Sequence, residues 1–164
     1  MPVRQPAMRV LIFVIGLGAF HSVSNGQGVG RSYLGDAASH AEIAKALSRA
    51  EASGSRVLVQ FGAPWRARCV RLDAKMSESS SIRSALDESY ELVRVDVGHF
   101  DSNLELARKY ECNIRTSGIP YLVILDSDGR VLVRQNSIML ETGDGYDEEA
   151  LVAFLHRWRS AKVK

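Results

Sequence analysis

Short apolar runs alternate along this chain with stretches of helical periodicity, and this alternation limits the fold more than any other feature. Strands are predicted over residues 56–61, 92–97, 121–125 and 130–134. Helices are predicted where apolar residues recur every three or four positions, over 39–54, 65–76, 82–86, 101–110 and 148–158. Strands separated by helices are typical of parallel sheets with right-handed crossovers, whereas the last two strands form a hairpin. The order predicts an α/β fold with one mixed sheet and helices on both faces.

Turn and capping residues predict where several of these elements begin and end. Asp36 or Ser39 is expected to cap the first helix, and Gly54 is expected to end it. The hairpin turn is the run Asp-Ser-Asp-Gly, in which Gly129 suits a positive φ.

Length and charge limit the kind of protein this is. A chain of 164 residues can bury one domain core. Lysine and arginine number 21 against 19 for aspartate and glutamate, and a net charge of +2 gives no reason to expect nucleic acid as a partner. The histidines and the two cysteines lack the spacing of metal ligands, so neither a metal nor another cofactor is expected.

The first 24 residues have the pattern of a secretory signal peptide. Arg4 and Arg9 precede an uncharged apolar run that is too short to span a membrane, which takes about 20 residues. Small residues predict cleavage after Ser24, or otherwise after Gly26; an uncleaved anchor or a buried helix is the alternative. Cleavage would leave the protein in the periplasm without a membrane anchor, where cysteines can pair. The expected organisation is a signal peptide over 1–24, a flexible Gly-rich lead-in over 25–38 and a folded domain over 39–164.

The most distinctive motif joins the first predicted strand to the second predicted helix. It reads Phe61-Gly62-Ala63-Pro64-Trp65-Arg66-Ala67-Arg68-Cys69, and Gly118-Ile119-Pro120 precedes a later strand. With the element order, these motifs resemble the thioredoxin superfamily over about residues 39 to 160, in particular its secreted bacterial members. The resemblance implies a thioredoxin-like fold, thiol–disulfide exchange, and a cis peptide bond between Ile119 and Pro120.

The chain departs from the family pattern where the chemistry depends on it. The resemblance implies a Cys-x-x-Cys pair at positions 66 and 69, but residue 66 is arginine. In the family's cycle the first thiolate attacks a disulfide and the second cysteine resolves the mixed disulfide, so this cycle is expected to be impaired. Gln60 stands where thioredoxins carry a buried aspartate that relays protons. The sequence leaves open whether the protein is an enzyme.

Cys69 and Cys112 are the candidate catalytic sulfurs. The start of a helix and the cluster Arg66, Arg68 and Arg71 favour a Cys69 thiolate, while burial favours the thiol. Cys69 is therefore either a reactive thiol or a small buried apolar residue. Cys112 lies in the loop that leads to the proposed cis-proline, so it either bonds to Cys69 or resolves a mixed disulfide there, or the two thiols never meet.

The resemblance also implies a surface for binding substrate. Trp65 and Arg66 flank the motif, and the backbone at Ile119 and Pro120 is expected to bind an extended peptide. The arginines would suit an anion at the helix start, or they are simply solvated. Two function classes follow: a secreted protein that exchanges disulfides with protein thiols or disulfides, and a non-catalytic module that binds a peptide or an anion. Nothing in the sequence indicates the oligomeric state.

Overall fold

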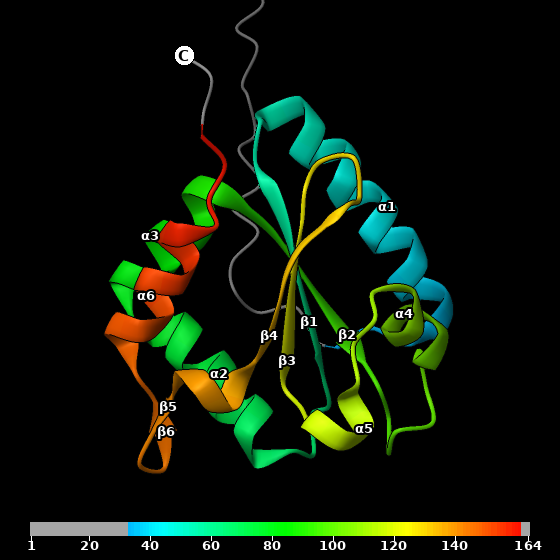
Figure 1. Cartoon of the computed structure of the whole chain (residues 1–164), viewed down its shortest axis with the longest axis vertical. Coiled ribbons are helices and arrows are strands. Elements are labelled where there is room, and N and C mark those ends of the chain that lie inside the picture. The colour runs from blue at the N-terminus through cyan, green and yellow to red at the C-terminus, as the bar shows by residue number, and fades with distance from the viewer. Residues whose placement is uncertain (1–32, 162–164) are drawn as a thin grey trace, which may run out of the picture.

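Four strands form the central sheet of this protein, whose computed structural model describes residues 33–161 (Figure 1). The predicted signal peptide over 1–24 lies outside the described residues. The strand order is β2-β1-β3-β4. The strands are β1 (Arg56–Gly62), β2 (Tyr90–Asp96), β3 (Tyr121–Leu125) and β4 (Val131–Asn136).

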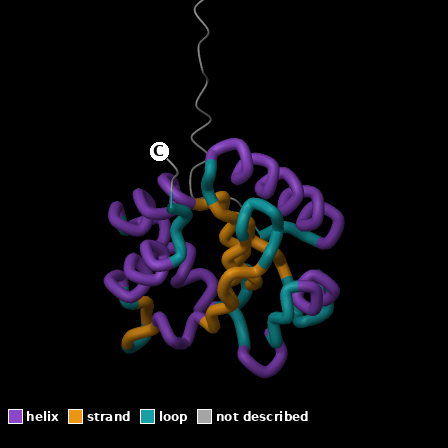
Figure 2. The backbone as a smooth tube through the Cα atoms, turned by 45° about the horizontal axis from the view of Figure 1, so that its top comes forward, coloured by secondary structure: helices purple, strands orange, loops and turns teal. Residues whose placement is uncertain are grey.

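Helices cover both faces of this sheet, as the alternating pattern predicted (Figures 1 and 2). One face lies beneath α1 (Asp36–Ser53) and α4 (Leu104–Lys109). The other lies beneath α2 (Ala67–Glu78), α3 (Ser80–Ser89) and α6 (Glu148–Arg157). The mixed α/β sheet is thereby confirmed.

Each face has its own apolar core because successive strand side chains point to opposite sides of the sheet. Along β1, Val57, Val59 and Phe61 pack into the core beneath α1. Leu58 packs into the other core, with Leu72 of α2 and Leu151 of α6. Cys69 belongs to the first core although the rest of α2 covers the second. The start of α2 therefore lies where the two cores meet, at the end of β1.

The third strand runs antiparallel to β1, where the alternating pattern predicted a parallel strand. β1 and β2 are parallel, whereas Val59 of β1 lies opposite Val123 of β3 in an antiparallel pair. The link from β2 to β3 contains only α4 and the four-residue α5 (Ile114–Ser117). A six-residue helix spans about 9 Å and a seven-residue strand about 23 Å, so these helices are too short to return the chain to the other end of the sheet.

The folded domain begins before residue 39, so the predicted lead-in extends too far. Leu34 forms a parallel bridge with Val95 of β2, and α1 begins at Asp36, with Gly35 at its N-cap. Leu34 N donates to Arg94 O at 3.1 Å, and Asp96 N donates to Leu34 O at 2.9 Å. The outer edge of β2 offers unpaired backbone groups, and these two hydrogen bonds satisfy a donor and an acceptor there. Residues 33–38 are therefore part of the domain.

Two predicted loops contain further structure. The loop over 111–118 contains α5, and the one that follows β4 contains the 3₁₀ helix η1 (Ser137–Leu140) and a small hairpin of β5 (Glu141–Thr142) and β6 (Gly145–Tyr146). Leu140 and Tyr146 are buried in the core beneath α2. Among the described helices, none has both the length and the apolar character needed to cross a bilayer.

Candidate functional site

Arg66 occupies the N-cap of α2, where the family pattern has its first cysteine. Its backbone is extended, with φ −83° and ψ 114°, and its side chain is exposed and forms no capping hydrogen bond. The backbone itself is well placed, since Val70 N donates to Arg66 O at 3.1 Å. The turn between β1 and α2 thus has the geometry of a helix start but carries no sulfur at its exposed position.

Cys69 lies one turn further along α2 and is completely buried. Burial raises the pKa of its thiol above the ordinary value of a cysteine. Hydrogen bonds from the Ala63 backbone and the Tyr33 hydroxyl, and the charge of Arg66, act in the opposite direction but do not outweigh burial. The thiol is therefore protonated at neutral pH, because burial outweighs the groups that favour the thiolate.

A polar network lies beneath the start of α2. Gln60 Nε2 donates to Tyr33 Oη at 2.5 Å and to Asp73 Oδ1 at 3.1 Å, and Arg94 Nε donates to the same carboxylate oxygen at 2.7 Å. Gln60 and Arg94 are buried. Tyr33 also packs against the core that contains Cys69, and hydrogen bonding by its hydroxyl lowers the pKa of that thiol. The network thus connects a half-buried ion pair to the buried thiol through two neutral groups.

The sequence singled out only Gln60 in this network. Asp73 follows Cys69 by four positions, a spacing that places two residues on the same face of a helix, and this signal could have identified it. No pattern points to Tyr33, because it stands 27 positions from Gln60 in a Gly-rich neighbourhood. Its place at the site follows from the pairing of Leu34 with β2.

Trp65 lies on the surface beside the motif, with 44% of its area exposed. Its indole Nε1 donates to Gly98 O at 2.9 Å, and its ring stacks on His99 with the centroids 4.8 Å apart and the planes 12° from parallel. Phe100 meets the same ring edge-on. The orientation of the indole is therefore held by the loop after β2, and its free face is open to a partner.

Ile119 and Pro120 precede β3 and are both buried. The peptide bond between them is cis, the isomer that the resemblance implies. Ile119 packs in the same apolar core as Cys69. Pro120 O accepts a long hydrogen bond, 3.4 Å, from Ser137 N. The structure thus brings Cys69 and the Ile-Pro segment to the same core.

Cys112 is a free thiol, as is Cys69, so the bond that the sequence allowed between them is absent from the described structure. Cys112 Sγ donates to Tyr110 O at 3.5 Å, and burial raises the pKa of its thiol to about 12. Its charged neighbours are Arg134 and Glu111, whereas those of Cys69 are Arg66 and Asp73. The two sulfurs therefore lie in different electrostatic surroundings.

The three arginines at the start of α2 differ in their surroundings. Arg68 Nε lies 3.6 Å from Glu141 Oε2 in the β5 strand, so an internal carboxylate takes the place of an external anion there. Arg66 and Arg71 are exposed. Within residues 33–161, no group of histidine, cysteine and acidic side chains is arranged to hold a metal ion.

Comparison with known proteins identifies the family. Residues 38–127 match the thioredoxin-like family. A disulphide isomerase from Xylella fastidiosa is similar, with 27% sequence identity and a TM-score of 0.66, over 78% of this chain and 96% of that chain. A DsbH oxidoreductase is similar with 20% identity and a TM-score of 0.55, over 80% of this chain and 88% of that chain. The C-terminal domain of DsbD from Neisseria meningitidis, in its oxidised form, has 16% identity and a TM-score of 0.56, over 78% of this chain and 100% of that chain. Among curated proteins, none matches the chain. The family match covers more than half of the chain and agrees with the observed fold, so this protein belongs to the thioredoxin-like family.

Proposed function

We propose that this protein takes part in thiol–disulfide exchange as a one-thiol member of its family, with Cys69 as the reacting sulfur. The observation that carries the proposal is a family scaffold with Cys69 in place and no sulfur at residue 66, the exposed N-cap of α2. The similarity to a disulphide isomerase at 27% identity supports exchange as the general chemistry. A two-thiol cycle would need a second sulfur at the N-cap.

The proposed reaction exchanges one disulfide for another. The Cys69 thiolate attacks a disulfide R–S–S–R′, a Cys69–S–S–R bond forms, and R′ leaves as a thiolate that takes up the proton Cys69 released. A thiol from the partner or from solution then attacks the mixed disulfide and regenerates Cys69. Electrons and protons balance at each step, and no second cysteine of this chain takes part.

Burial limits the rate of this reaction. Because Cys69 is buried and its pKa is raised, exchange at neutral pH is slow and increases as the pH rises. A partner would be a protein thiol or disulfide bound across Trp65, Arg66 and the Ile119-Pro120 segment. The location we propose is the periplasm, after removal of residues 1–24 as a signal peptide.

A second function has its own support. Trp65 is exposed and its ring is held on His99, and Arg66 beside it is also exposed. An oriented aromatic ring next to a cation suits a non-catalytic module that binds an extended peptide or an anion. In that case partner binding survives the change Cys69→Ser and is lost with Trp65→Ala.

Trapping of a mixed disulfide tests the proposed function. The native protein is incubated with oxidised glutathione at mildly alkaline pH, and intact mass and peptide mapping locate the adduct. We expect an adduct on Cys69 in the wild type and in Cys112→Ala, and no adduct in Cys69→Ser. An adduct confined to Cys112, or a native protein that stays unmodified while the denatured protein reacts, would contradict the proposal.

A further inference from the structure

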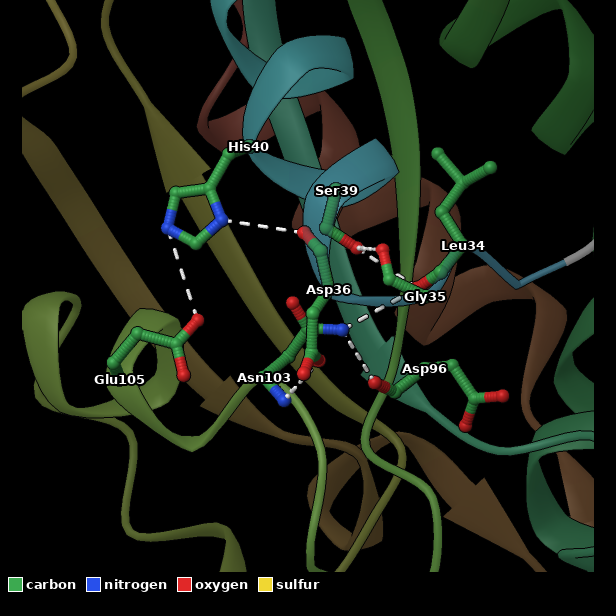
Figure 3. A network of polar contacts seen from close by, with 8 residues as sticks. All are labelled: Leu34, Gly35, Asp36, Ser39, His40, Asp96, Asn103 and Glu105. Atoms are coloured by element: carbon green, nitrogen blue, oxygen red, sulfur yellow. Dashed lines mark hydrogen bonds and ion pairs between the residues drawn. The ribbon is translucent and has the colours of Figure 1, made fainter.

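The first described residues form a strap that is tied down at several points. Residues 33–36 are called the N-terminal strap below. Asn103, which is 1% exposed, donates through Nδ2 to Asp96 O at 2.7 Å and to Leu34 O at 3.4 Å (Figure 3). Its backbone N donates to Asp36 Oδ1 at 2.7 Å. With the bridge from Leu34 to β2, these bonds hold the strap against the sheet edge and the start of α4.

The strap places Tyr33 against the motif. Its side chain lies over Gly62, the last residue of β1, so closely that a Cβ added there would lie 2.5 Å from Tyr33 Oη. Tyr33 also packs against the apolar core that contains Cys69, and its hydroxyl acts as a hydrogen-bond partner that lowers the pKa of that thiol. Glycine at position 62 therefore makes room for the phenol, which extends from the sheet edge to the start of α2.

The hydrogen bonds around Tyr33 determine which way its proton points. Arg94 pairs with Asp73, so this carboxylate accepts hydrogen bonds, and the Gln60 amide must present its NH₂ group to it. The same NH₂ group donates to Tyr33 Oη, whose oxygen therefore acts as an acceptor. Burial raises the pKa of the phenol well above its usual range, so it keeps its one proton. The Cys69 sulfur is a hydrogen-bond partner of the phenol and can accept that proton.

We propose that Tyr33 is a positioning residue for Cys69: it donates its hydroxyl proton in a hydrogen bond to the sulfur and so stabilises the thiolate in a buried site. Gln60 orients Tyr33, and the Asp73–Arg94 pair orients Gln60. Cys69 also faces Arg66, whose charge favours the thiolate, Asp73, whose charge opposes it, and the phenol of Tyr146 from β6. The role of this hydrogen bond in thiol–disulfide exchange rests on the proposed function, whereas the effect of Tyr33 on the ionisation of Cys69 does not.

Titration of Cys69 in the variant Tyr33→Phe tests this proposal. In a Cys112→Ala background, Cys69 is the only thiol, and its ionisation is followed by ultraviolet absorbance and by the rate of reaction with iodoacetamide as the pH is raised. Phenylalanine keeps the ring and removes the donor. Because a hydrogen bond to the charged thiolate is lost, we expect the midpoint of the Cys69 titration to rise by about one pH unit. At a given pH this corresponds to a thiolate fraction that is about tenfold smaller.

Tyr90→Phe is the matched control. The Tyr90 hydroxyl is also buried, and it donates to Leu155 O at 2.7 Å in the core beneath α3 and α6. The control removes the same atom without touching Cys69, so the Cys69 midpoint is expected to stay as in the parent. An equal rise in both variants would show a general loosening of the fold and would overturn the proposal.

Gln60→Leu provides a second, independent readout. It leaves Tyr33 and Cys69 in place but removes the donor that orients the phenol, so a smaller rise in the Cys69 midpoint is expected. If Tyr33→Phe folds and the midpoint of its Cys69 titration is unchanged or lowered, the proposal is overturned. If Tyr33→Phe does not fold, an unchanged Cys69 midpoint in Gln60→Leu overturns the proposal instead. A shifted midpoint in a protein that never forms a mixed disulfide would instead refute the proposed function alone.

Discussion

Arg66 and Cys69 lie one turn apart at the start of α2, with the arginine side chain exposed and the thiol completely buried. The resemblance implies a dithiol at these two positions, and of that pair this chain has the buried sulfur and an arginine at the exposed position. The exposed position has become a cation at the positive end of a helix, which is electrostatically unfavourable. Both the stability and the chemistry of this protein should therefore respond to residue 66.

Replacing Arg66 with aspartate should stabilise the fold. The N-cap has no side-chain hydrogen bond, and an aspartate there can accept one from the first turn while its charge suits the helix dipole. We expect the free energy of unfolding to rise by about 1 kcal/mol, measured by urea denaturation. Arg66→Ala is the control, since it removes the cation without adding a cap and should gain less. An Arg66→Asp variant less stable than Arg66→Ala would contradict the N-cap assignment.

Adding a methyl group at Gly62 should displace the Tyr33 phenol. The new Cβ would lie 2.5 Å from Tyr33 Oη, whereas a Cβ at Gly35 meets nothing within 4 Å. Gly62→Ala is therefore expected to lower the free energy of unfolding by roughly 1–3 kcal/mol, and Gly35→Ala, the matched control, by far less.

The loss at Gly62 should depend on Tyr33. In the background Tyr33→Ala the clash is absent, so Gly62→Ala should cost little, and a double-mutant cycle should show coupling between the two positions. Additive effects of the two substitutions would mean that Tyr33 does not lie over Gly62.

Alkaline pH should destabilise the fold through Cys112. Burial raises the pKa of this thiol to about 12 in the folded state, against an ordinary value of 9.0. At pH values below the ordinary pKa, the Cys112 thiol is neutral in both the folded and the unfolded state. Its full contribution to the free energy of unfolding is therefore present at those pH values. Between the two values only the unfolded state ionises, and the free energy of unfolding falls as the pH rises, by up to about 1.4 kcal/mol per pH unit.

The comparison of wild type with Cys112→Ala isolates this effect, because the other buried groups are common to both proteins. Urea denaturation from about pH 8 to about pH 11 should give a wild-type stability that declines more steeply than that of the variant. Parallel profiles would show that Cys112 ionises in the folded state as easily as in the unfolded one.

The sequence predicted the sheet and the helices on both of its faces because short local patterns determine these elements. Alternating strands and helices, a glycine after α1 and a tight hairpin turn are all visible within short windows. The antiparallel direction of β3 was missed because it depends on the length of α4 and α5, and the pattern over 101–110 predicted a longer helix than the six residues that form.

The candidate site was predictable only in part, for a similar reason. Trp65, Arg66 and Cys69 stand in one contiguous motif, so the sequence identified them together. Tyr33 reaches the same place from another part of the chain through the pairing of Leu34 with Val95, a contact that no local pattern encodes. The arrangement that surrounds the thiol is thus a product of the tertiary fold.

Reduction of a protein disulfide by wild type and by Arg66→Cys tests whether the arginine at residue 66 interrupts the two-thiol cycle. Insulin is the substrate, dithiothreitol regenerates the protein, and Arg66→Cys/Cys69→Ser is the control. We expect little turnover by wild type, rapid turnover by Arg66→Cys together with a disulfide between residues 66 and 69, and loss of that turnover in the control. Wild-type turnover as fast as that of Arg66→Cys, or an Arg66→Cys variant that forms the disulfide but stays inactive, would contradict the proposal that the arginine at residue 66 interrupts the two-thiol cycle.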